Sequence, residues 1–209
     1  FRNQYGRETR FIPNGVNRPE IRKAELITDK FGLTKDSYIL FLGRLVPEKG
    51  IRYLIEAFKN VKTEKKLVIA GGSSDTDSFM KELKELAKDD KRIIFTGFVQ
   101  GQMLEELYSN AYIYTLPSDL EGMPLSLLEA MSYGNCCLVS DIQECTEVVE
   151  DKALIFKKSN VQDLQNKLQE ACDRAEKIME LKQQAADYIC KKYNWDDVVK
   201  ETLKLYRRK

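Results

Sequence analysis

The sequence predicts an α/β fold with a doubly wound parallel sheet, and three observations support this prediction. Strand-like apolar runs alternate with amphipathic helical stripes along the 209 residues. The strand-like runs are continuously apolar, which is typical of strands buried on both faces of a sheet. Four of them are followed by a glycine or a proline: Gly43, Gly71, Gly97 and Pro117. Right-handed crossovers between such strands place helices on both faces of the sheet.

The expected strands follow one another along most of the chain. In chain order they are residues 38–42, 66–70, 93–96, 112–116, 136–140 and 153–156. A further short strand is expected at 11–16, where Pro13, Asn14 and Gly15 form a turn. Residues 1–22 differ in character from the rest and are expected to be an opening segment of the single domain 1–209.

Helices are expected between the strands, because apolar residues recur there at spacings of three and four. The stripes and segments that predict them are Ile51, Leu54, Ile55 and Phe58; Phe79, Leu83, Leu86 and Ala87; residues 102–109; and Val161, Leu164 and Leu168. Pro124 suits the first turn of another helix, where its missing N–H costs nothing. Ser159 or Asn160 is the expected N-cap of the helix at Val161. Residues 175–209 are expected to hold two helices with a break near Tyr193.

The composition limits the possible classes of function. Lys plus Arg (34) minus Asp plus Glu (33) leaves a net charge of +1, so nucleic acid is not an expected partner. The chain has no histidine, which excludes a histidine general base and a Ser–His triad. Its five cysteines form no CxxC pair. They are expected to be reduced core residues of a cytosolic protein, and no zinc site is expected.

No apolar stretch reaches the roughly 20 residues that a membrane helix needs, and no signal peptide is visible. A cytoplasmic location is therefore expected. The basic tail at 206–209 could contact acidic lipids at the inner face of a membrane, although a frayed helix end also explains it. The chain starts at Phe1 and not at methionine, so we expect a fragment of a longer protein.

Two cations follow the first predicted strand. Arg44 comes directly after Gly43, and Lys49 lies five residues further on, where the next helix begins. Ligands of an open parallel sheet bind at the carboxyl ends of its strands. A guanidinium fork and a compact ammonium at such a position suit a diphosphate. The alternative interpretation is a solvated turn with two surface cations.

Two acids flank the helix that follows residues 112–116. Glu121 lies in the loop before that helix and Glu129 in its second turn. The free N–H groups near Leu125 and Ser126 favour a phosphate, and a carboxylate nearby can accept hydrogen bonds from hydroxyl groups. This combination suits a nucleotide sugar. Alternatively, Glu129 is a half-buried acid with satisfied hydrogen bonds and Glu121 is an exposed loop acid.

Three stretches in this order and spacing resemble the carboxyl-terminal domain of family 4 retaining glycosyltransferases. They are residues 43–50, with Arg44 and Lys49; Gly97-Phe98; and residues 117–131, with Glu121, Gly122, Pro124 and Glu129. Residues 12–16 are similar to the interdomain crossing of that family, and 193–196 with the following helix are similar to its last helix. The resemblance covers most of the chain. It implies a Rossmann-like domain that is the C-terminal half of a two-domain GT-B fold, with an N-terminal acceptor domain absent from this chain.

The resemblance also implies functional roles. Arg44 and Lys49 hold the donor diphosphate and stabilise it as it leaves, so neither a catalytic metal nor a cofactor is expected. Glu129 accepts hydrogen bonds from ribose hydroxyls, and Glu121 contacts the transferred sugar. The residues expected to contact the donor are Arg44, Lys49, Phe98, Val99, Gly122, Met123, Pro124, Leu125, Ser126 and Glu129. Those expected to act in catalysis are Glu121, Arg44 and Lys49, and these cations and acids are expected to line a common cleft.

Some positions depart from the family pattern. Residues 141–147 lack the glycines and proline that often follow the strand ending at Ser140, and Cys136 stands where a proline is common. Asp75-Thr76-Asp77 spells the DxD signature of a different glycosyltransferase fold. Helix capping and solvation explain these residues.

The expected function is transfer of a sugar from a nucleotide diphosphate sugar to a sugar, polysaccharide or lipid-linked acceptor. Two alternatives keep the cationic pair: a nucleotide-binding module without catalysis, and a sugar phosphorylase of similar fold. A phosphorylase has no need to recognise ribose, so the role of Glu129 separates it from a transferase. The sequence does not identify the base, the sugar or the acceptor.

Overall fold

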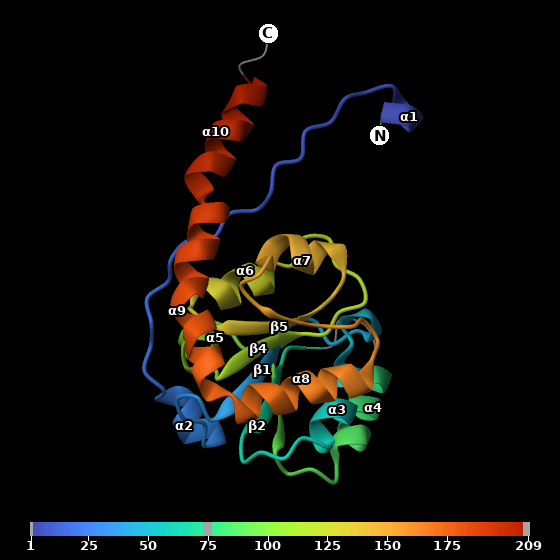
Figure 1. Cartoon of the computed structure of the whole chain (residues 1–209), viewed down its shortest axis with the longest axis vertical. Coiled ribbons are helices and arrows are strands. Elements are labelled where there is room, and N and C mark those ends of the chain that lie inside the picture. The colour runs from blue at the N-terminus through green and yellow to red at the C-terminus, as the bar shows by residue number, and fades with distance from the viewer. Residues whose placement is uncertain (1, 73–76, 207–209) are drawn as a thin grey trace.

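The computed structural model describes residues 2–72 and 77–206. Its strands are β1 (Tyr38–Leu42), β2 (Lys66–Ala70), β3 (Ile93–Gly97), β4 (Ile113–Leu116), β5 (Cys136–Ser140) and β6 (Leu154–Phe156). In the described part of the chain these six strands form one parallel sheet in the order β3-β2-β1-β4-β5-β6 (Figure 1). The prediction of a doubly wound parallel sheet is therefore confirmed.

Helices alternate with the strands. They are α1 (Arg2–Tyr5), α2 (Leu26–Phe31), α3 (Ile51–Lys59), α4 (Asp77–Ala87), α5 (Gln102–Asn110), α6 (Leu125–Ser132), α7 (Gln143–Val149), α8 (Val161–Asp173), α9 (Ala175–Lys192) and α10 (Trp195–Tyr206), with the 3₁₀ turn η1 at Pro47–Lys49. Helices α3, α4 and α8 lie together on one side of the sheet, and α6 and α7 lie on the other (Figure 1). The sheet is thus covered on both faces, as its continuously apolar strands require.

The core forms where the predicted apolar stripes meet the sheet. Ile51, Leu54 and Phe58 of α3 are fully buried, and α3 packs against α8. The central strand β1 pairs with β2 on one side and with β4 on the other, so that Ile39 lies between Leu67 and Ile113. The loops after β1 and β4 therefore emerge side by side.

Three local features differ from the prediction or decide between alternatives. Residues 11–16 form no strand; the Val16 N–H instead donates to the Tyr193 carbonyl oxygen between α9 and α10, at 2.7 Å. Pro13 lacks an N–H to donate to a neighbouring strand. Helix α7 occupies most of the loop expected after β5. Asn160, and not Ser159, caps α8, because its side chain accepts from the Asp163 N–H at 2.9 Å.

A buried carboxylate holds α2 against α5. The Glu106 side chain is fully buried, and its Oε2 accepts from the N–H groups of Glu25 and Ile27 at 3.0 and 3.1 Å. The Gln102 side chain donates to Oε1 at 2.9 Å. Burial alone raises the pKa of Glu106, but these hydrogen bonds outweigh it and lower the pKa below its ordinary value of 4.5. Glu106 therefore stays ionised and satisfies the free N–H groups at the start of α2.

Glu106→Gln should lower the free energy of unfolding at pH 7 by about 2 kcal/mol, since hydrogen bonds to a charged acceptor are lost. The lowered pKa sets the pH dependence. The stabilisation is fully present above pH 4.5 and is lost as the pH falls through the folded-state pKa, which lies below that value. Urea unfolding from pH 7 to pH 3 should show the difference between wild type and variant narrowing below pH 4.5. A difference that is constant with pH would contradict this role.

Candidate functional site

The candidate site lies at the carboxyl-terminal edge of the sheet, where the strand order changes direction. The chain builds outward from β1 to β3, returns to β4 beside β1, and builds outward again to β6. The helices that follow β1 and β4, α3 and α6, lie on opposite faces of the sheet (Figure 1). Open parallel sheets bind ligands at this position, and the loops that reach it from β1 and β4 are residues 43–50 and 117–124. Half of the predicted donor contacts lie on these two loops.

Backbone contacts hold the two loops together. Gly50 has a φ of +68°, and a Cβ atom there would lie 1.9 Å from the Pro117 carbonyl oxygen, so the approach requires glycine. The Asp119 N–H donates to the Glu48 carbonyl oxygen at 2.8 Å. The Tyr53 hydroxyl donates to the Asp119 carboxylate at 2.9 Å. The loops after β1 and β4 therefore form one packed unit.

Lys49 and Glu121 meet where the two loops join. Nζ of Lys49 lies 2.6 Å from Oε1 of Glu121, and the two side chains are only 15% and 7% exposed. The Ser118 hydroxyl donates to the same carboxylate oxygen at 2.6 Å, and the Ser140 hydroxyl donates to the Ser118 carbonyl oxygen at 2.5 Å. An ammonium group has three N–H donors. Lys49 can therefore offer N–H groups to an anion while it remains paired with Glu121.

Arg44 is exposed and lines a cavity of about 450 Å³. The residues around this cavity are Leu42, Gly43, Arg44, Gly71, Gly72, Phe98, Val99, Gln100 and Leu104. Their surface is mostly apolar, and the Phe98 side chain is 75% exposed. The structure thus brings Phe98 and Val99 into one cavity with Arg44. An apolar cavity with a guanidinium in its wall suits a ligand that has both a flat ring and an anionic group.

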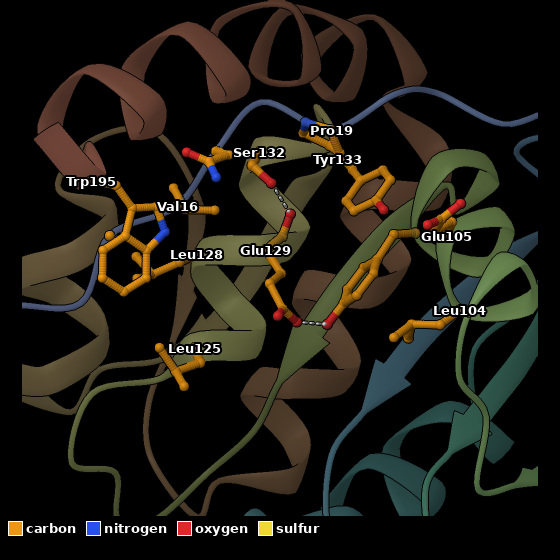
Figure 2. Close-up of a pocket in the computed structure, with 14 residues that line it drawn as sticks. Val16, Pro19, Leu104, Glu105, Leu125, Leu128, Glu129, Ser132, Tyr133 and Trp195 are labelled. Carbon is orange, nitrogen blue, oxygen red and sulfur yellow. Dashed lines mark hydrogen bonds between the residues drawn. The ribbon is translucent and has the colours of Figure 1, made fainter.

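A second cavity of about 430 Å³ adjoins the first, because Leu104 lines both. Glu129, in the second turn of α6, lines this second cavity (Figure 2), and its Oε2 accepts from the Tyr108 hydroxyl at 3.1 Å. Arg44 and Glu129 therefore line two neighbouring cavities, which share Leu104 at the start of α5. A common cleft lined by the cations and the acids stays a prediction.

The N-terminus of α6 lies one residue later than predicted. Pro124 is the N-cap and not part of the first turn, and its carbonyl oxygen accepts from the N–H groups of Leu127 and Leu128 at 3.0 and 3.2 Å. The N–H groups of Leu125 and Ser126 have no acceptor within the helix. An anion at this end of α6 would meet them and the positive end of the helix dipole.

Both ends of the chain contribute contacts that the sequence analysis did not predict. The Met123 sulfur accepts from the Asn14 N–H at 3.1 Å. Trp195 lines the same cavity as Glu129 (Figure 2), and a Cβ atom at Gly15 would lie 2.7 Å from its ring. Residues 14–15 and the start of α10 therefore pack beside the candidate site. The remaining predicted contact, Gly122, is exposed in the loop before α6.

The described residues, 2–72 and 77–206, contain no group of three His, Cys, Asp or Glu side chains placed to hold a metal ion. Asp75 of the DxD motif lies outside these ranges, so the capping interpretation stays a prediction. All five cysteines are free. Burial raises the pKa of Cys136 and of Cys145 to about 12, so neither is a thiolate at neutral pH.

Comparison with known proteins agrees with this geometry. The family model described as "Glycosyl transferases group 1" matches residues 23–188. The uncharacterized glycosyltransferase MJ1607 of Methanocaldococcus jannaschii is 30% identical over 181 residues, which are 82% of this chain and 45% of that protein. An N,N'-diacetylbacillosaminyl-diphospho-undecaprenol alpha-1,3-N-acetylgalactosaminyltransferase of Campylobacter jejuni is 28% identical, over 90% of this chain and 49% of that protein. The chain thus spans about half the length of the curated relatives that it matches.

A solved structure shows the same fold. The crystal structure of Anabaena Alr3699/HepE in complex with UDP and glucose superimposes with a TM-score of 0.80 at 17% identity, over 87% of this chain and 51% of that chain. At this identity the likeness supports the fold alone. It agrees with the sheet order and the helical layers described above.

Gly50→Ala should disrupt the join between the two loops. The variant combines a strained φ with a clash against the Pro117 carbonyl oxygen, and we expect the free energy of unfolding to fall by at least about 3 kcal/mol. Gly97→Ala is the matched control, because Gly97 has a similar φ of +72° but a Cβ atom there meets nothing within 4 Å. Only the strain of about 1 kcal/mol is expected in that variant. Urea unfolding measures both variants. If Gly50→Ala and Gly97→Ala lowered the free energy of unfolding equally, the importance of the Gly50–Pro117 contact would be contradicted.

Proposed function

The chain belongs to the family of glycosyl transferases group 1, and we propose that it is the donor-binding, carboxyl-terminal half of a family 4 retaining glycosyltransferase with a GT-B fold. The observation that supports this best is the pairing of Lys49 with Glu121 at the join of the two central loops. In the proposal Lys49 is the cation for the leaving diphosphate, and Glu121, its neighbour, is the acid that contacts the transferred sugar. Arg44 lies on the same loop as Lys49, in the wall of an adjoining cavity.

In this proposal the diphosphate of the donor lies between the N-terminus of α6 and the two cations. Arg44 offers paired N–H groups to phosphate oxygens, and Lys49 offers the N–H groups that Glu121 does not use. Negative charge grows on the diphosphate as the bond to the sugar breaks. Fixed cations and helix N–H groups stabilise that charge. We therefore propose that no metal ion takes part.

The nucleoside would occupy the two neighbouring cavities. The base lies beside Phe98 and Val99 in the cavity of about 450 Å³, and the ribose hydroxyls donate to Glu129. Leu104 borders both cavities, so a nucleoside that spans them packs against this side chain. This arrangement separates the apolar contacts of the base from the polar contacts of the ribose.

The proposed reaction transfers the sugar with retention of its anomeric configuration. The bond between the anomeric carbon and the diphosphate oxygen breaks, and a bond from the same carbon to an acceptor hydroxyl oxygen forms on the same face. The hydroxyl proton passes to the departing phosphate oxygen. Glu121 contacts the sugar and stabilises positive charge near its anomeric carbon. The described residues offer no obvious covalent nucleophile, and the cysteines near the site are protonated.

The relatives suggest classes of donor and acceptor. The name of the Campylobacter relative specifies an undecaprenol-linked acceptor, and the Anabaena structure holds UDP and glucose. We propose that this protein takes a nucleotide diphosphate sugar and a sugar, polysaccharide or lipid-linked acceptor. Its further partner is an N-terminal domain that supplies most of the acceptor contacts.

Within residues 2–72 and 77–206, no helix has the length and apolar character needed to cross a bilayer. A cytoplasmic location with peripheral contact at the inner membrane face remains part of the proposal, since lipid-linked acceptors lie at that face. The basic residues 207–209, which suggested such contact, lie outside the described residues.

Arg44→Ala should weaken binding of a nucleoside diphosphate about tenfold or more, because charge-assisted hydrogen bonds to phosphate are lost. Binding of the matching nucleoside should change less than about twofold. A thermal-shift panel of UDP, GDP and ADP selects the base, and calorimetry then measures both affinities. Arg52→Ala is the control, since this exposed arginine pairs with Glu82 on the outer surface of α3 and α4. If Arg44→Ala lowered the affinities for the nucleoside and for the nucleoside diphosphate by the same factor, the proposed role of Arg44 would be contradicted.

The chain of residues 1–209 should bind a nucleoside diphosphate but should not transfer sugar, because in this proposal an N-terminal domain supplies most of the acceptor contacts. Release of nucleoside diphosphate from UDP-glucose, GDP-mannose and ADP-glucose measures turnover, with and without an undecaprenyl-diphosphate-linked sugar as acceptor. The control is the longer protein that includes an N-terminal domain, which should turn over at least one of these donors. Sustained sugar transfer by the 209-residue chain alone would refute the proposal that this chain binds the donor and an N-terminal domain binds the acceptor.

A further inference from the structure

The carboxylate of Glu129 has one fixed contact although its side chain is exposed. Glu105, the other acid of the cavity, is paired with Arg22, whose Nε lies 3.0 Å from its carboxylate. Glu129 has no cation partner among the described residues, and its carboxylate bonds only to the hydroxyl of Tyr108, at 3.1 Å (Figure 2). An exposed glutamate with free rotamers would lose side-chain entropy on binding a ligand. The contact with Tyr108 removes part of that freedom beforehand.

The hydroxyl of Tyr108 is itself held in place. Its ring is 1% exposed and stacks on Tyr133, with the ring centroids 5.2 Å apart and the planes at 18°. The only other acceptor near the hydroxyl in the described residues is the Ser126 carbonyl oxygen, at 3.4 Å. Burial raises the pKa of Tyr108 well above its ordinary value, so the hydroxyl remains a donor at neutral pH. A rigid, permanently protonated donor therefore faces the carboxylate.

We propose that Tyr108 is a positioning residue, which holds Oε2 of Glu129 and leaves Oε1 directed at the ribose hydroxyls of the donor. This inference rests on the proposed function, because it assumes that the cavity of Glu129 receives the ribose. Oε1 has no hydrogen-bond donor among residues 2–72 and 77–206. A carboxylate accepts through both of its oxygens. One oxygen can therefore bind the protein while the other binds the ligand.

The direct test is the preference for ribose over 2′-deoxyribose. UDP and 2′-deoxy-UDP are titrated into the 209-residue chain by calorimetry, together with the matching guanine and adenine pairs. Wild type should bind the ribonucleotide of one pair more tightly than its 2′-deoxy form. Tyr108→Phe keeps the stacked ring and removes only the hydroxyl, and it should reduce that ratio of affinities about fivefold. The ratio is insensitive to any unfolded fraction of the variant, because both ligands experience it equally.

Two controls separate positioning from a general structural effect. Tyr112→Phe removes another buried hydroxyl, which donates to the Ala171 carbonyl oxygen at 2.7 Å near α8, and it should leave the ratio unchanged. In a Glu129→Ala background, Tyr108→Phe should have no further effect on the ratio, because the hydroxyl then has no carboxylate to hold. A further fall in that background would show that Tyr108 acts independently of Glu129 and would overturn the inference.

The remaining outcomes are distinct. A chain that binds none of the six nucleotides contradicts the proposed function itself. A wild type that binds ribo and deoxyribo forms equally overturns the inference and the ribose role of Glu129. A Tyr108→Phe variant that keeps the wild-type ratio overturns the role of Tyr108 alone and leaves the proposed function intact.

Discussion

The close approach of the Gly50 backbone to the Pro117 carbonyl oxygen is the constraint on which the candidate site depends. It joins the loop after β1 to the loop after β4 at the point where the sheet reverses its order. Lys49 and Glu121 lie on different loops, so without this contact the formation of their ion pair would carry the entropic cost of ordering both loops. With it, the pair forms in a largely buried position. The fold thus brings together the cation and the acid to which we assign the phosphate and the sugar, before any ligand binds.

The rest of the site extends from this join to a pair of cavities. Leu104 lines both the apolar cavity of Arg44 and the more polar cavity of Glu129. Each acid is bonded to a hydroxyl group of the protein, Glu121 to that of Ser118 and Glu129 to that of Tyr108. Such contacts reduce the motion of both carboxylates, the largely buried Glu121 and the exposed Glu129, and favour a single arrangement for a bound ligand.

The sequence predicts the sheet well, because strands that are buried on both faces appear as continuous apolar runs that end in glycine or proline. The strand expected at 11–16 does not form: Gly15 and Val16 pack against Trp195 and Tyr193, at the break between α9 and α10, and Phe11 is exposed. Helix α7 has an apolar stripe of Cys145, Val148 and Val149, which is too short to predict a helix from spacing alone. The cations and acids of the site were predicted from motifs that fall after strands. Tyr108 was not, because its position in α5 indicates a core residue and its contact with Glu129 joins positions 21 residues apart.

The most direct test of the central claim is a titration followed by amide chemical shifts. The nucleoside diphosphate that binds, whether UDP, GDP or ADP, is added to the ¹⁵N-labelled chain. If the two loops form one site, amides of residues 43–50 and of residues 121–126 should shift along saturation curves with the same dissociation constant. Shifts confined to one loop, or two loops that saturate at different concentrations, would contradict the account.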